Sequence, residues 1–207
     1  EATLAHVLVS KYADHLPLYR QAQIYSRQGI DLDRSTLAAW VGKSAFELTP
    51  VYNALMDDLK RSTKLFMDET PAPVLAPGRK RTKTGYFWAL ARNDKPWSGD
   101  DPPGVAFTYA PGRSGQHADN ILNGFSGTLQ VDGYAGYNRL LKRPTQDVTL
   151  AYCWAHARRE LHDVTQSGAA PIAQEGLNQI QALYRIEKDL RGLSADQRSA
   201  ARQKRSR

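Results

Sequence analysis

Hydrophobic and polar positions follow two different patterns along the chain, and the change comes near residue 62. Before it, apolar residues recur at helical spacing, as in Leu37, Trp40 and Val41. After it, short apolar runs alternate with loops rich in Pro and Gly, which is typical of strands. Beyond Gly168 the pattern is helical again. We therefore expect three parts: a helical region at 1–62, an α/β core at 63–167 and a helical segment at 168–207.

The first region is predicted to hold two main helices separated by a turn at Gly29. Glycine readily adopts the left-handed conformation that ends helices. Ser35 is predicted to cap the second helix, and Thr49 with Pro50 to begin its continuation, because Pro is tolerated in a first turn. Such a pair is either a DNA-reading helix-turn-helix or a plain helical hairpin, and the sequence leaves both open.

The core is predicted to contain five strands, at 64–68, 84–91, 105–109, 128–131 and 148–152. The first three follow one another through loops, which favours an antiparallel meander. The last two are each reached through a helix, at 114–122 and 137–141, which favours parallel pairing. This order predicts a ribonuclease H-like α/β fold. We expect a mixed five-stranded sheet flanked by helices, preceded by the helical region and followed by a partial helical segment.

Two aspartates stand at the ends of predicted strands. Asp68 follows the first strand and Asp132 follows the fourth, and these strands are neighbours in the predicted fold. Two adjacent carboxylates repel each other unless a cation bridges them, and hard oxygen ligands suit Mg²⁺ or Mn²⁺. Taken singly, each Asp also fits a strand-end turn. Glu69 is expected to point to the opposite face of the sheet and to be a neighbour of the site.

The chain has 28 Lys and Arg residues against 21 Asp and Glu, a net charge of +7. This balance favours a polyanionic partner such as nucleic acid, or serves only for solubility. A basic turn next to Asp68 carries Arg79, Lys80, Arg81 and Lys83, which are candidates for phosphate contacts or a solvated turn. Arg113 precedes a predicted helix start, a position suited to phosphate or to a simple cap.

The remaining composition limits the class of protein. Cys153 is the single cysteine, so an internal disulfide is excluded and a reducing compartment is favoured. With His156 it forms half of a zinc motif, for which a packed Cys and a helix-face His is the preferred interpretation. No run approaches the roughly 18 apolar residues of a membrane span, and residues 1–10 lack a signal peptide pattern. We therefore predict a cytoplasmic protein.

Several segments together resemble one family. They are YADHLPLYR at 12–20, RSTLAAWV at 34–41, MDETP at 67–71, PGRSGQHA at 111–118, LQVDGYAGYN at 129–138 and CWAHARR at 153–159. In this order and spacing the chain resembles the insertion sequence 66 family of bacterial transposases, over most of its length up to about Glu187.

The resemblance implies a DDE transposase in which Asp68 and Asp132 match the first two catalytic acids. It implies double-stranded DNA as partner, both transposon ends and target, and assembly into a homo-oligomer on DNA. The third acid of the family is a Glu in an Asn-rich segment, expected beyond Arg207. Inside the chain Glu160, Glu175 and Glu187 are the local candidates.

Two other functions remain open at this point. One is a truncated, catalytically inactive DNA-binding remnant of a transposase. The other is a different ribonuclease H-like nuclease, which would cleave an RNA–DNA hybrid.

Overall fold

The computed structural model describes residues 1–207 except 77, 79–80, 98, 145–146 and 207. The chain divides into two compact units, Glu1–Leu55 and Met56–Arg207. The division falls inside helix α4, Thr49–Lys60. The predicted division into parts at residues 62 and 167 stays a prediction.

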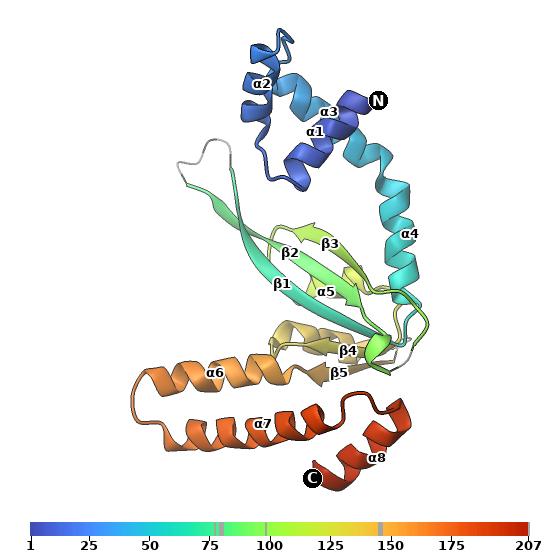
Figure 1. Ribbon diagram of the computed structural model, residues 1–207, viewed down its shortest axis with the longest axis vertical. Helices are drawn as coiled ribbons and strands as arrows, with labels where there is room; N and C mark the ends of the chain where they lie inside the picture. The colour runs from blue at the N-terminus through green and yellow to red at the C-terminus, as the bar shows by residue number, and fades with distance from the viewer. Residues whose placement is uncertain (77, 79–80, 98, 145–146, 207) are drawn as a thin grey trace. The chain divides into compact units, whose positions relative to one another are not determined.

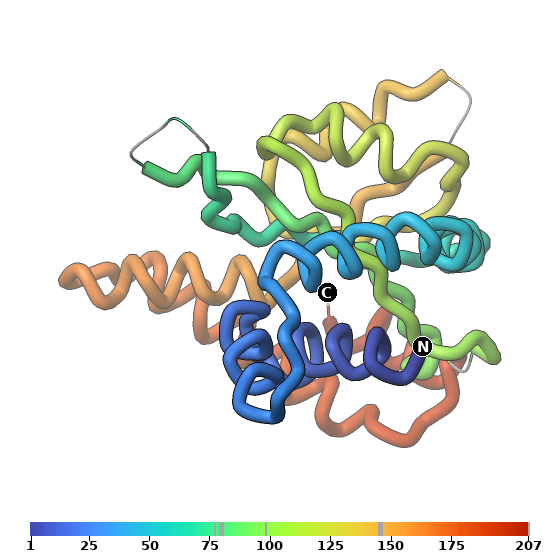
Figure 2. The backbone as a smooth tube through the Cα atoms, turned by 90° about the horizontal axis from the view of Figure 1, so that it is seen from above, coloured from blue at the N-terminus to red at the C-terminus, as the bar shows by residue number. Residues whose placement is uncertain are grey.

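The first unit is helical, and its helices gather around one small core (Figures 1 and 2, blue). It contains α1 Ala2–Tyr12, α2 Leu18–Arg27, α3 Arg34–Glu47 and the start of α4. Val7, Tyr25 and Leu37, one from each of the first three helices, form the buried centre. Burial of these side chains, rather than helix propensity alone, stabilises such short helices.

The boundaries of these helices follow local chemistry. Gly29 adopts a φ of +80° just after α2, where the turn was predicted. The cap predicted at Ser35 is wrong, because Asp33 caps α3 instead. The Asp33 carboxylate accepts the backbone N–H of Ser35 at 2.7 Å and its hydroxyl at 2.9 Å. A carboxylate at this position also interacts favourably with the positive end of the helix dipole.

The second unit is built on one mixed sheet (Figure 1). Its strands are β1 Lys64–Val74, β2 Lys83–Arg92, β3 Gly104–Ala110, β4 Gly127–Val131 and β5 Val148–Tyr152. The spatial order is β3-β2-β1-β4-β5. The first three strands pair antiparallel, and β4 pairs parallel with both β1 and β5. This is the predicted α/β architecture, and it is consistent with a ribonuclease H-like fold.

Besides the end of α4, the described part of this unit contains the helical segments η1 Lys95–Trp97, α5 Gly115–Ile121, η2 Ala135–Lys142, α6 Trp154–Gln166, α7 Pro171–Asp189 and α8 Ala195–Arg205. One face of the sheet is buried, and its central side chain Trp88 contacts His117 of α5 and Tyr137 of η2. Helices α6 and α7 pack side by side (Figure 1, orange). Within the described part of the chain, no helix is long and apolar enough to cross a bilayer.

Strand β1 is longer than predicted and runs through Pro71 and Pro73 to Val74. Beyond Asp68 this strand pairs only with β2, because β4 already ends at Val131. Proline lacks a backbone N–H and is therefore tolerated where one strand edge is unpaired. The extension moves the β1–β2 turn away from Asp68.

Candidate active site

Strands β1 and β4 bring the two predicted acids to the same edge of the sheet. Phe66 pairs with Gln130 in parallel register, and two residues further along each strand come Asp68 and Asp132. Asp132 follows the carboxyl end of β4, whereas Asp68 lies inside β1 opposite Ala89 of β2, and not at a strand end as the sequence predicted.

The two aspartates have different surroundings. Asp68 is exposed, and its Oδ1 accepts the backbone N–H of Glu69 at 3.0 Å. The Asp132 side chain is 19% exposed. Its Oδ1 accepts the N–H of Tyr134 at 2.8 Å, so Asp132 shapes the turn that leaves β4. Its Oδ2 lies 3.3 Å from Nη2 of Arg113.

Glu69 has a larger part in this region than its sequence position suggested. Alternation along β1 places it on the buried face, where its side chain is 0% exposed. Arg113 donates from Nε to Oε1 at 2.5 Å, and the hydroxyl of Tyr137 donates to Oε2. Both carboxylate oxygens are therefore satisfied, as a buried charge requires. The sequence signal was an acid at a buried strand position, which needs a partner, but nothing local identified Arg113 or Tyr137.

Arg113 links Glu69 to Asp132. It lies just before Ser114, the cap of α5, and binds both Glu69 and Asp132. Its guanidinium stacks over the ring of Tyr134 at 4.0 Å. Burial alone would lower the pKa of Arg113, but the hydrogen bond to Glu69 and the two negative charges raise it, so the side chain stays cationic. At 41% exposure it is still accessible to an anion.

Tyr137 supports Glu69 from the centre of η2. It is buried, and its ring packs edge-on against Trp88 and Tyr134. Burial raises the pKa of Tyr137, and the negative charges of Glu69, Asp132 and Asp68 raise it further. The phenol therefore keeps its proton and acts as a hydrogen-bond donor.

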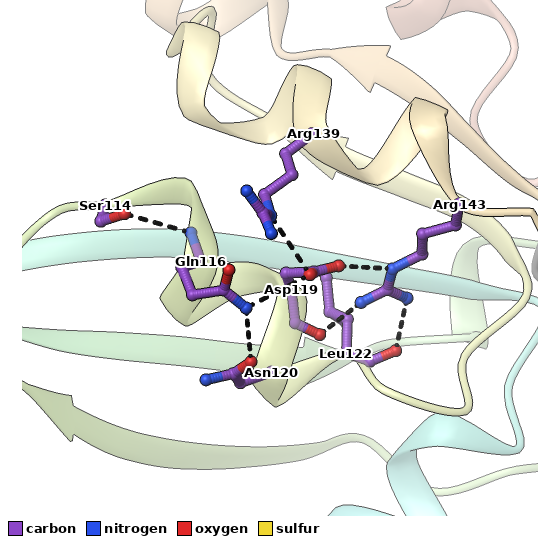
Figure 3. A network of polar contacts seen from close by, with 7 residues as sticks. All are labelled: Ser114, Gln116, Asp119, Asn120, Leu122, Arg139 and Arg143. Atoms are coloured by element: carbon purple, nitrogen blue, oxygen red, sulfur yellow. Dashed lines mark hydrogen bonds and ion pairs between the residues drawn. The ribbon is translucent and has the colours of Figure 1, made fainter.

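An ionic network around Asp119 holds η2 against α5 (Figure 3). Arg143 donates from Nε to Asp119 at 2.7 Å and from Nη1 to the Leu122 carbonyl at 2.8 Å. Arg139 donates to the second Asp119 oxygen at 3.2 Å. The hydrogen bond from Arg143, and then that from Arg139, lower the pKa of Asp119 although its partial burial opposes the shift. This network fixes the helix that carries Tyr137.

The structure describes only some of the residues that were predicted to contact phosphate. Arg79 and Lys80 lie outside the described residues. Arg81 and Lys83 are exposed. Lys83 pairs with Val74, six positions beyond Asp68 on β1, or about 20 Å along an extended strand. Lys83 therefore does not lie next to Asp68, where the basic turn was expected.

The local candidates for a third acid lie elsewhere. Glu187 forms a bidentate pair with Arg202 at 2.6 and 2.7 Å, and Glu175 binds Gln179. Glu160 is exposed on α6. Among the residues that the structure describes, no three His, Cys, Asp or Glu side chains are grouped to hold a metal ion.

Cys153 is the N-terminal flanking residue of α6, and it is half-buried. Its backbone N–H donates to the carbonyl of Val131, one residue before Asp132. Burial opposes ionisation of the thiol, but hydrogen bonds from His156 and Ala155 outweigh it and lower the pKa of Cys153.

The whole chain, residues 1–207, matches a family described as Transposase IS66 family. The chain belongs to the IS66 transposase family, which confirms the resemblance carried by its motifs.

Curated relatives come from Sinorhizobium fredii (strain NBRC 101917 / NGR234). The uncharacterized protein y4jD is 45% identical over 99% of this chain, and the uncharacterized protein y4qI is 41% identical over 100% of this chain. The chain spans 41% and 39% of these two relatives. It therefore represents about two-fifths of their length.

Proposed function

We propose that this chain is the part of a DNA transposase that carries the first two metal-binding acids, Asp68 and Asp132. The reaction is metal-dependent phosphoryl transfer: cleavage at transposon ends, followed by joining of the 3′-hydroxyl to target DNA. The observation that carries the proposal is the parallel register of β1 and β4, which brings both acids to one edge of the sheet.

The residues at this edge fit a divalent cation. Mg²⁺ binds through one or two carboxylates and completes its shell with water and phosphate oxygens, and Mn²⁺ accepts the same ligands. Asp68 is exposed, and Asp132 already has the cationic Arg113 beside it. The guanidinium offsets part of the negative charge of Asp132, so its contact with Asp132 would have to loosen when a cation binds there.

Divalent ions bound here would activate the attacking oxygen and stabilise the leaving one. The residues of the chain position the reactants. Asp68 and Asp132 hold the ions, and Arg113 offers a fixed positive charge to the phosphate. Water and then the 3′-hydroxyl are the nucleophiles, so no covalent bond between the protein and DNA is formed.

DNA is the proposed partner, and the residues named here as its contacts are part of the same proposal. The net charge of +7 supports attraction to phosphates. Arg113 lies at the carboxylate edge, whereas Arg81 and Lys83 lie on the β1–β2 hairpin and would contact DNA at a distance from Asp68. Arg79 and Lys80 are proposed for the same role on sequence alone.

The test is cleavage of transposon-end DNA by the protein that contains this chain, with Mg²⁺ present. The proposal is supported if the Asp132→Asn variant still binds DNA but no longer nicks it. Nicking that survives in both Asp132→Asn and Asp68→Asn excludes these residues as the ligands.

A second candidate function rests on the net charge of +7, which favours DNA binding and requires no metal site. The chain would then be a DNA-binding remnant without catalytic activity. In that case it shifts duplex DNA at low salt, and no DNA is cut with either Mg²⁺ or Mn²⁺.

A further inference from the structure

We infer that Glu69 and Tyr137 are positioning residues, which hold Arg113 at the carboxylate edge so that its guanidinium contacts a DNA phosphate. The inference rests on the proposed function, because DNA must lie next to Asp68 of β1 and Asp132 after β4. It adds two residues that neither touch DNA nor hold metal.

The positioning contacts come from three separate parts of the chain. Glu69 is on β1, Tyr137 is on η2, and Arg113 lies in the loop before α5. The Arg113 Nε–Oε1 bond and the Tyr137 hydroxyl contact use both oxygens of Glu69. The hydroxyl of Tyr134 fixes the backbone of Arg113 by donating to its carbonyl at 2.6 Å. Side chain and backbone of Arg113 are thus both restrained.

Burial makes this arrangement persistent. The Glu69 side chain is 0% exposed, so movement of Arg113 would leave a buried carboxylate without its cation, which is strongly unfavourable. Arginine normally loses much side-chain entropy when it binds a ligand. Here the folded protein has already restricted the side chain, so binding an anion costs less.

The contact with Asp132 is the weaker of the two ion pairs. Arg113 lies 3.3 Å from the Asp132 oxygen but 2.5 Å from that of Glu69. A metal ion on Asp132 can therefore replace this contact while the bond to Glu69 is kept. The exposed part of the guanidinium then remains beside the metal-binding edge, where a phosphate would lie.

A purely structural ion pair makes a different prediction from a positioning role. Replacing an acid on a DNA-binding protein removes a negative charge, and this change alone strengthens DNA binding. If Glu69 acts through Arg113, Glu69→Gln weakens binding instead. The effect must also disappear once Arg113 has been replaced.

The experiment measures binding of a labelled DNA duplex of mixed sequence to the 207-residue chain, over a series of salt concentrations. The variants are Glu69→Gln, Tyr137→Phe, Arg113→Ala and the double variant Glu69→Gln/Arg113→Ala. We expect Arg113→Ala to lower the slope of log K against log salt by about one, the value for one lost phosphate contact. Glu69→Gln should weaken DNA binding about three- to tenfold relative to wild type. The double variant should bind DNA no more weakly than Arg113→Ala alone.

The matched control is the exposed ion pair between Asp189 and Arg205, 2.8 Å apart on α7 and α8. Asp189→Asn removes one acid in the same way and should leave DNA binding unchanged or tighter. Tyr137→Phe removes only a hydroxyl, so it gives a second test if Glu69→Gln does not fold. Hydrogen exchange of the Arg113 Nε–H reports the restraint without DNA, and it should accelerate in both variants.

The outcomes separate the two proposals. A wild-type chain that does not bind DNA in a salt-dependent way overturns the proposed function, and the inference with it. A wild-type chain that binds, with additive effects of Glu69→Gln and Arg113→Ala, overturns only the positioning role. Unchanged exchange of the Nε–H in Glu69→Gln and Tyr137→Phe also overturns it.

Discussion

The guanidinium of Arg113 lies 3.3 Å from the carboxylate of Asp132. An acid proposed as a metal ligand thus already has a cationic neighbour, which is held from its other side by buried Glu69. The proposed metal-binding edge is therefore partly neutralised before any ion would bind, and several measurable effects follow.

Removing the positive charge beside Asp132 should strengthen cation binding. The double variant Glu69→Gln/Arg113→Gln is suited to this test, because it leaves no unpaired buried charge. We expect Mn²⁺ to bind about three- to tenfold tighter, since a nearby like charge no longer opposes it. Titration calorimetry measures the change, and weaker Mn²⁺ binding in the folded double variant would contradict the account.

The Asp119 network should contribute stability that depends on pH. Asp119→Asn removes the charge that Arg143 and Arg139 bind, and should cost about 1–3 kcal/mol in the free energy of unfolding at neutral pH. The pKa of Asp119 is lowered in the folded state from its ordinary value of 3.8. Its contribution is therefore present above that value and is lost as pH falls through the folded pKa.

Urea unfolding of wild type and Asp119→Asn over the acidic range checks this. The difference between the two proteins should shrink as pH falls. A difference that stays constant down to the lowest pH would show that the Asp119 charge does not stabilise the fold.

Close packing of α5 on η2 predicts a second effect on stability. A Cβ atom at Gly115 would lie 2.3 Å from the carbonyl oxygen of Gly136, which is too close for a backbone contact. We expect Gly115→Ala to destabilise the unit by about 1–3 kcal/mol through overpacking. The control is Gly112→Ala, because the nearest atom to a Cβ there is 4.0 Å away. Equal melting temperatures of the two variants would contradict the prediction.

The β1–β2 hairpin should contact DNA independently of the carboxylate edge. Replacing Arg81 and Lys83 together by Ala should lower the slope of log K against log salt by about two, one for each lost phosphate contact. Because Lys83 pairs with Val74, about 20 Å along the strand from Asp68, affinity for Mn²⁺ should not change. A salt dependence equal to that of wild type would exclude both residues from the DNA interface.

Local patterns in the sequence predicted most of the sheet. The apolar runs before Asp68 and Asp132, and the helices that separate the last strands, predicted the parallel pairing of β1 with β4. The sequence did not predict that β1 continues beyond Asp68, because Pro71 and Pro73 are unfavourable inside a paired strand. They are tolerated here because β4 ends at Val131 and leaves that edge of β1 unpaired.

The site was predicted less completely than the sheet. Asp68 and Asp132 stand out because each follows an apolar run. The partners of Glu69 are 44 and 68 residues away in the chain, and no periodicity links them. Only the packing of η2 and of the loop before α5 against the sheet brings Arg113 and Tyr137 to Glu69.

The position of a bound metal tests the central claim most directly. Crystals of the chain soaked in Mn²⁺ would reveal the ion by its anomalous scattering. We predict a peak that carboxylate oxygens of both Asp68 and Asp132 coordinate, and that is absent from crystals of Asp132→Asn. A peak that neither aspartate touches, or one that persists in Asp132→Asn, would contradict the claim that these two aspartates form the metal site.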